Sequence, residues 1–178
     1  MSEIKTYTGI MFDPLAPDTK KINIQDIAHA LSLICRANGH FKTFYSVGQH
    51  CINCAEEAAA RGYTVRVQLA CLLHDGSEAY MSDVTRPVKR MLPKYLEIEK
   101  PLQDAIWNKW IGVLTDEEIR QVFEIDDAML GNEFMALMDT RLYEHIPQLT
   151  SVPQYAFAGF ELTEQQYLGL FKNLIGRK

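Results

Sequence analysis

The sequence predicts an all-α protein that forms a single domain over residues 1–178. Apolar residues recur at helical spacing along most of the chain, capping residues precede several of these stretches, and no segment has a convincing strand pattern. A chain of 178 residues is also long enough to bury one full hydrophobic core. Residues 1–22, which are rich in Pro, Asp, Gly and Thr, are expected to be irregular or to form a short hairpin.

Three helices are predicted in the first half of the chain. The first begins near residues 23–26, where capping residues precede an apolar stripe, and NGH at 38–40 interrupts it. The second begins at Ser46 and ends before Gly62, a residue suited to the position after a helix. The third covers residues 65–80 and is apolar on nearly all sides at first, which is typical of a central helix.

Further helices are predicted in the second half. Thr85 and Pro87 resemble the cap and first turn of a short helix, and residues 96–112 form an amphipathic segment. Residues 115–138 open with Thr115 and Glu118 in the spacing of a capping box. Residues 145–162 are expected to be a loop, followed by a last helix that begins at Thr163.

Composition narrows the classes of partner. The formal net charge of −5 makes a broad basic surface unexpected, and duplex nucleic acid is therefore not a predicted partner. The chain contains neither a signal-peptide pattern nor the roughly 20 apolar residues of a membrane helix. A cytosolic protein is expected, with its four cysteines, including the CINC pair, packed as reduced thiols.

The stretch LACLLHDGSEAYMSD, residues 69–83, points to chemistry. An apolar run leads directly into His74 and Asp75, and an isolated buried carboxylate is costly unless it is paired or binds a metal. Imidazole nitrogens and carboxylate oxygens are ligands of divalent metals. A second histidine is available at His50 on the predicted second helix, and a second carboxylate at Asp126 or Asp127.

These motifs resemble those of the HD-domain metal-dependent phosphohydrolases. The matching segments are YSVGQH (45–50), LLHDGSEAYMSDVTRPVK (72–89) and DDAMLGNE (126–133), and residues 26–40 resemble the family's opening helix. Within the family, the likeness is greatest to bacterial 5′-deoxynucleotidases and phage deoxynucleoside triphosphohydrolases. It covers roughly residues 22–140.

The resemblance implies a role for each of eight residues. The expected ligands of one divalent ion (Mn, Co, Zn, Fe, Ni or Mg) are His50, His74, Asp75 and Asp127. Asp127 is preferred to Asp126 because it lies six residues before Glu133, the spacing seen in the family. The residues expected at the reaction and the substrate are Glu78 and Asp83 as catalytic carboxylates, and Arg36 and Lys89 as contacts to phosphate.

The implied activity is metal-dependent hydrolysis of nucleotide phosphates, either of deoxynucleoside triphosphates such as dATP or of deoxynucleoside monophosphates. A homo-oligomer, dimeric or hexameric, is expected in the cytosol of a bacterium or of a phage-infected cell. One departure leaves deoxyribose selectivity open, because Arg36 is followed by Ala37 and the deoxynucleotidases typically have Trp there. Two alternatives are a non-catalytic nucleotide or metal sensor on the same scaffold and a structural helical protein.

Overall fold

Helices dominate a computed structural model that describes residues 3–178. Two short antiparallel strands, β1 (Ile4–Lys5) and β2 (Met11–Phe12), form a hairpin at the N-terminal end. The helices are α1 (Ile24–Leu33), the 3-10 turn η1 (Arg36–Gly39), α2 (Val47–Ala60), α3 (Val65–Leu73), α4 (Glu78–Met81), α5 (Arg86–Lys89), α6 (Pro93–Trp110), α7 (Asp116–Met138) and α8 (Phe160–Arg177).

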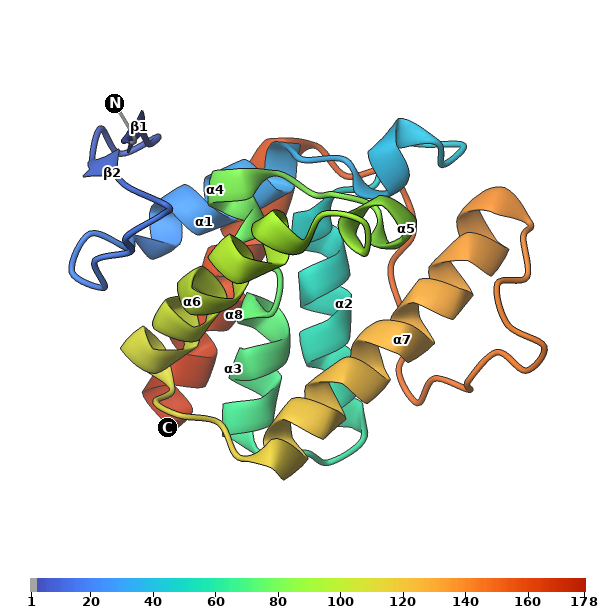
Figure 1. Ribbon diagram of the computed structural model, residues 1–178. Helices are drawn as coiled ribbons and strands as arrows, with labels where there is room; N and C mark the ends of the chain where they lie inside the picture. Colours follow the sequence, from blue (N-terminus) through green and yellow to red (C-terminus); the bar gives the residue numbers. More distant parts are fainter. Residues whose placement is uncertain (1–2) are drawn as a thin grey trace.

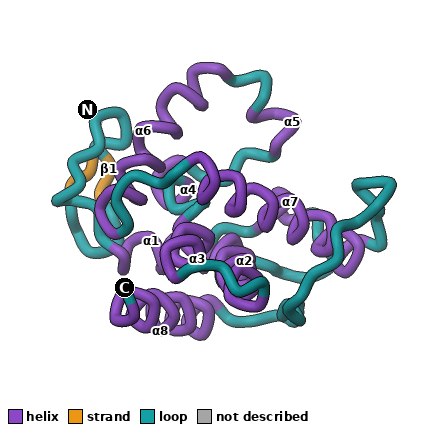
Figure 2. The backbone as a smooth tube through the Cα atoms, turned by 90° about the horizontal axis from the view of Figure 1, so that it is seen from below, coloured by secondary structure: helices purple, strands orange, loops and turns teal. Residues whose placement is uncertain are grey.

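The antiparallel pair α2 and α3 lies at the centre of the bundle (Figure 1). Helix α7 crosses this pair on one side, and α8 packs on the other side against α1, α2 and α3 (Figure 2). Helix α5 and the start of α6 lie out from the bundle (Figure 2), whereas the second half of α6 packs against α3 and buries Leu102 and Ile106 in the core. Most buried apolar side chains belong to one cluster that includes Leu31, Leu72 and Met129. The arrangement therefore surrounds α2 and α3 with other helices.

Several helix starts agree with the expectations from the sequence. The side chain of Asn23 accepts a hydrogen bond at the start of α1, and Ser46 and Gln49 form a capping box at the start of α2. Thr115 and Glu118 form the predicted box at the start of α7. Each cap satisfies backbone N–H groups that have no partner within the helix, which explains why these boundaries were readable from sequence.

The predicted continuous helix over residues 65–80 is wrong. Helix α3 ends at Leu73, and a turn at residues 74–77 separates it from the short α4. Gly76 lies in this turn, where an added Cβ would stand 3.0 Å from the carbonyl oxygen of Leu73 and 3.2 Å from the side chain of Ile106. This close approach favours glycine. The break places His74 and Asp75 beyond the end of a buried helix.

The start of the last helix also differs from the expectation. Helix α8 begins at Phe160 with Gly159 as its N-cap, and Thr163 lies one turn inside. The Thr163 hydroxyl is buried and donates a hydrogen bond to the Gly159 carbonyl, so it bonds back into the helix and does not cap it.

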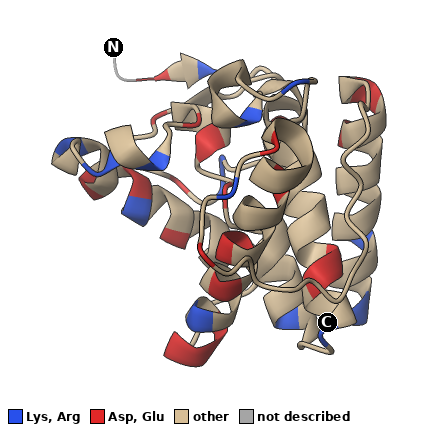
Figure 3. Cartoon of the chain, turned by 90° about the vertical axis from the view of Figure 1, so that its right-hand side faces the viewer, with Lys and Arg blue, Asp and Glu red and all other residues tan. Residues whose placement is uncertain are grey.

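None of the helices in the described part of the chain combines the length and the apolar character that a membrane crossing requires. Acidic and basic residues are interspersed along the ribbon in the view of Figure 3.

Arg66 joins the start of α3 to the start of α7. Its guanidinium donates to both carboxylate oxygens of Glu118, at 2.7 and 3.1 Å, and to the carbonyl oxygens of Ile111 and Val113. These hydrogen bonds hold the pKa of Glu118 at about 2, below its usual value of 4.5. Because α7 carries residues that face α2 and α3, this contact helps to set its position.

We expect Arg66→Ala to lower the free energy of unfolding by about 1 kcal/mol at pH 7. A carboxylate with a depressed pKa contributes its stability above the unfolded value, and that contribution is lost as the pH falls from about 4.5 through about 2. The gap between wild type and variant should therefore narrow over that range in urea denaturation curves. Arg120→Ala, which removes an exposed arginine paired with Glu117, is the control and should have little effect. A gap that does not change with pH would contradict the assignment.

Candidate metal centre

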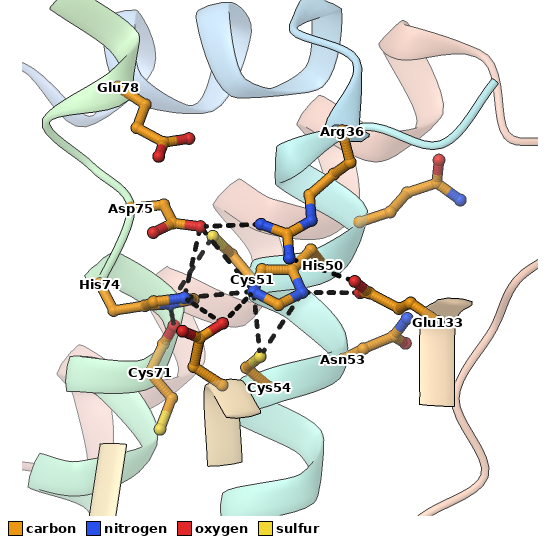
Figure 4. Close-up of polar contacts among 12 residues, drawn as sticks. Arg36, His50, Cys51, Asn53, Cys54, Cys71, His74, Asp75, Glu78 and Glu133 are labelled. Carbon is orange, nitrogen blue, oxygen red and sulfur yellow. Dashed lines mark hydrogen bonds and ion pairs between the residues drawn. The ribbon is translucent and has the colours of Figure 1, made fainter. Parts of the chain in front are cut away.

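Four side chains from three helical regions converge beside the central pair of helices (Figure 4). The Nε2 atoms of His50 and His74 lie 3.2 Å apart. Oδ1 of Asp126 lies 3.2 Å from Nε2 of His50 and 3.7 Å from Nε2 of His74. Oδ2 of Asp75 lies 3.3 Å from Nε2 of His74 and 3.8 Å from Nε2 of His50. We call these four residues the His–Asp cluster.

The hydrogen bonds of the second ring nitrogen define the tautomer of each histidine. Nδ1 of His50 lies 2.6 Å from Oε1 of Glu133, and Nδ1 of His74 lies 2.7 Å from the carbonyl oxygen of Cys71. A carboxylate and a carbonyl only accept hydrogen bonds, so each Nδ1 carries a proton. In the neutral rings both Nε2 lone pairs then point into the His–Asp cluster.

The cluster therefore brings together acceptor atoms that repel one another without a cation or extra protons between them. Ligands about 2.1 Å from one ion lie roughly 3.0 to 3.4 Å from each other in octahedral or tetrahedral geometry, close to the distances seen here. The raised pKa of His74 has the same origin: burial lowers this pKa, but the charge of Asp75 and the contacts with Cys51 and Asp126 together outweigh burial. The His–Asp cluster could hold a divalent metal ion.

Two thiols border the cluster on the α2 side. Sγ of Cys54 lies 3.6 Å from Nε2 of His50, and Sγ of Cys51 lies 4.0 Å from Nδ1 of His74. Donor atoms of His50, Cys54 and His74, and separately of Cys51, His74 and Asp75, are close enough to share an ion. Burial raises the pKa of Cys51 to about 11, which favours the uncharged thiol. Nitrogen and oxygen atoms are therefore the readier ligands.

Asp126, and not the predicted Asp127, lies at the histidines. Asp127 is exposed and pairs with Arg86 at 2.6 Å. The helical period explains the difference, because Asp126 and Glu133 are seven residues apart, which is nearly two turns and places both on one face of α7. Glu133 contacts Nδ1 of His50 while Asp126 contacts its Nε2. Asp127 is turned about 100° away from that face.

Glu78 lies in the first turn of α4, near Asp75 (Figure 4). Its side chain is buried, and its Oε2 atom has no hydrogen-bond partner among the described residues. Burial raises the pKa of Glu78 well above its usual value, and the charges of Asp75 and Asp83 raise it further. Such a carboxyl group is suited to accept or donate a proton near neutral pH.

Asp83 and Lys89, the other two residues predicted near the substrate, both follow Glu78 in the chain. Asp83 is partly buried, and burial raises its pKa. Lys89 lies 3.5 Å from Oε1 of Glu78 but is closer to Glu99 on α6, at 2.7 Å. The ammonium of Lys89 is thus already paired, where the sequence suggested a cation available to phosphate.

Arg36 approaches the His–Asp cluster from η1. Its guanidinium lies 3.4 Å from Asp75 and 3.2 Å from Glu133, and the side chain is nearly buried. Burial works against its charge, but the surrounding carboxylates, Glu133 first among them, together outweigh burial and raise the pKa of Arg36. Arg36 therefore remains a cation beside the cluster.

Sequence reasoning missed three residues that support the site. Glu133 was used only as a marker of spacing, although its side chain is fully buried and contacts both His50 and Arg36. Tyr45 donates a hydrogen bond to Glu133, and Asn53 donates one to the Tyr45 hydroxyl. The two-turn spacing of Asp126 and Glu133 was the available signal for a shared face.

No protein-family model matches the chain. The chain is 38% identical over 112 residues to the uncharacterized protein YfdR of Escherichia coli strain K12, covering 62% of this chain and 59% of YfdR. It is also 38% identical over 108 residues to the uncharacterized protein RCAP_rcc00048 of Rhodobacter capsulatus, covering 57% of this chain and 55% of that protein. The matches therefore span less than two thirds of these relatives, whose names state no activity.

Exchange of each aspartate separately tests which one belongs to the metal centre. We expect Asp126→Asn to weaken Mn²⁺ binding at least tenfold, because it removes a charged acceptor from the His–Asp cluster. Asp127→Asn should leave Mn²⁺ affinity within about threefold of wild type. Calorimetric titration measures both. Equal losses in the two variants, or loss only in Asp127→Asn, would contradict the arrangement.

Proposed function

We propose that the protein is a divalent-metal-dependent phosphohydrolase of the HD-domain type that acts on nucleotides. The observation that carries the proposal is the convergence of two imidazole Nε2 atoms and two carboxylate oxygens, beside a buried carboxyl group with one oxygen that has no hydrogen-bond partner among the described residues. Binding of one metal requires only the first part of that arrangement. Glu78 adds a group suited to proton transfer, which favours catalysis over binding alone.

A bound divalent ion would polarise a phosphoryl oxygen and lower the pKa of water. His50, His74, Asp75 and Asp126 would hold it. The four ligands carry two negative charges when both imidazoles are neutral, so they balance one divalent ion.

The other side chains supply proton transfer and charge. Glu78 would take the proton of the water that attacks phosphorus, since its Oε2 has no competing hydrogen bond among the described residues. Arg36 would bind a phosphate oxygen and offset the charge that develops on the phosphoryl group. Asp83 would orient the water or the sugar.

The nucleotide is proposed from the resemblance of motifs. Substrates of either class remain in the proposal, namely deoxynucleoside triphosphates such as dATP and deoxynucleoside 5′-monophosphates. Ala37, which takes the place of a bulky residue after Arg36, has a left-handed backbone with φ of 51°. A small side chain at this position offers no bulk to exclude a 2′-hydroxyl. We also propose a cytosolic homo-oligomer.

A direct assay tests the activity. We expect release of phosphate, pyrophosphate or triphosphate from a panel of ribo- and deoxynucleotides when Mn²⁺, Co²⁺, Zn²⁺ or Mg²⁺ is added, and loss of that release in Asp75→Ala. The identity of the product distinguishes monophosphate from triphosphate substrates. Bound metal without turnover of any nucleotide would refute the hydrolase and favour a non-catalytic sensor.

A second variant separates proton transfer from metal binding. Glu78→Gln should lower kcat by about 10²- to 10⁴-fold, because the amide cannot accept the proton. Mn²⁺ affinity should stay within about threefold, since Glu78 is not a ligand in the proposed set. Glu97→Gln, a substitution of an exposed glutamate on α6, is the matched control. Unchanged kcat in Glu78→Gln would remove this residue from the mechanism.

A further inference from the structure

Glu133 contacts both a histidine of the His–Asp cluster and the guanidinium of Arg36. Its side chain is completely buried on α7 and accepts hydrogen bonds from three residues. Oε1 accepts from Nδ1 of His50 at 2.6 Å and from the Tyr45 hydroxyl at 2.9 Å. Oε2 accepts from Nη2 of Arg36 at 3.2 Å. One carboxylate oxygen thus contacts a histidine of the His–Asp cluster, and the other contacts the guanidinium of Arg36.

A chain of hydrogen bonds holds this carboxylate in place. Asn53 donates to the Tyr45 hydroxyl at 2.8 Å, so the hydroxyl proton is directed to Glu133. The other end of the Asn53 amide accepts from the backbone N–H of Gln154 at 3.1 Å, and the same amide donates to the Gln154 carbonyl. The direction of each bond is therefore set from the 154 backbone through to Glu133.

We propose that Glu133 is a positioning residue that orients a metal-ligating histidine and an anion-binding arginine at the same time. Through Oε1 it keeps the proton of His50 on Nδ1, which leaves Nε2 free for a metal. Through Oε2 it holds Arg36 beside Asp75, where the guanidinium can reach an oxyanion bound at the same metal. This inference rests on the proposed function for the kind of anion that binds.

The two oxygens allow the two roles to be separated. In Glu133→Gln the amide oxygen can still accept from His50 and Tyr45, whereas the amide NH₂ then faces Arg36, which is itself only a donor. The variant should keep the proton of His50 on Nδ1 but lose the hydrogen bond that holds Arg36. In Glu133→Ala both contacts are lost.

Binding measurements on the full chain test the proposal without any need for turnover. Calorimetry with Mn²⁺ alone reports on the metal centre, and titration of the Mn²⁺-loaded protein with sulfate, a tetrahedral dianion, reports on the anion site. We expect Glu133→Gln to weaken sulfate binding about tenfold or more with Mn²⁺ affinity within about threefold. Glu133→Ala should also weaken Mn²⁺ binding, by about 10- to 100-fold, as is typical when the partner of a ligating histidine is removed.

Two further variants control for other effects. Asp26→Asn alters another buried carboxylate, which accepts hydrogen bonds from the backbone N–H and the hydroxyl of Thr8, so it should lower the melting temperature without changing either affinity. Arg36→Ala should reproduce the sulfate loss of Glu133→Gln.

Two results would overturn the positioning role. The first is wild-type affinity for both ions in Glu133→Ala. The second is equal loss of Mn²⁺ binding in Glu133→Gln and Glu133→Ala, which would indicate a charge effect in place of two oriented contacts. Failure of the proposed hydrolysis is a separate outcome, since it would appear as absent nucleotide turnover in wild type with these binding results unchanged.

Discussion

The arrangement of the site depends on holding mutually repelling acceptor atoms together. The Nε2 atoms of His50 and His74 are 3.2 Å apart, with carboxylate oxygens of Asp75 and Asp126 at similar distances. Packing of α2, α3 and α7 provides the force that keeps them there, since these helices bury side chains such as Cys51, Leu72 and Met129 against one another. A cation among these atoms would offset their mutual repulsion.

Helix α2 makes polar contacts through two of its faces. One face carries His50 and Cys54 toward the His–Asp cluster, while Gln49, Asn53 and Glu57, spaced at one turn each, bind the backbone of residues 150–156. This segment precedes α8 and has few backbone hydrogen bonds of its own. The polar face of α2 therefore orders a long loop. This loop is linked by hydrogen bonds through Asn53 and Tyr45 to Glu133, the partner of His50.

The sharp end of α3 is the local feature that creates the site. A helix continued through His74 would direct Asp75 and Glu78 along its own surface. The turn at 74–77 instead places the two residues after Leu73 at the end of a buried helix, and it begins α4 with Glu78. The short α5 then carries Arg86 back to α7, where its guanidinium pairs with the carboxylates of Asp126 and Asp127.

The sequence by itself determined the all-α class and the caps of three helices, and its motifs predicted that His50, His74 and Asp75 lie together, as their side chains do. Caps and periodicity are local signals, because they depend on residues within one or two turns of each other. The turn within 65–80 was not predicted, since part of what leaves no room for a side chain at Gly76 is Ile106 on α6, a residue distant in sequence. The choice between Asp126 and Asp127, the role of Glu133 and the pairing of Lys89 with Glu99 were decided only in the tertiary structure. Each depends on the rotation of one helix relative to another, which local sequence does not specify.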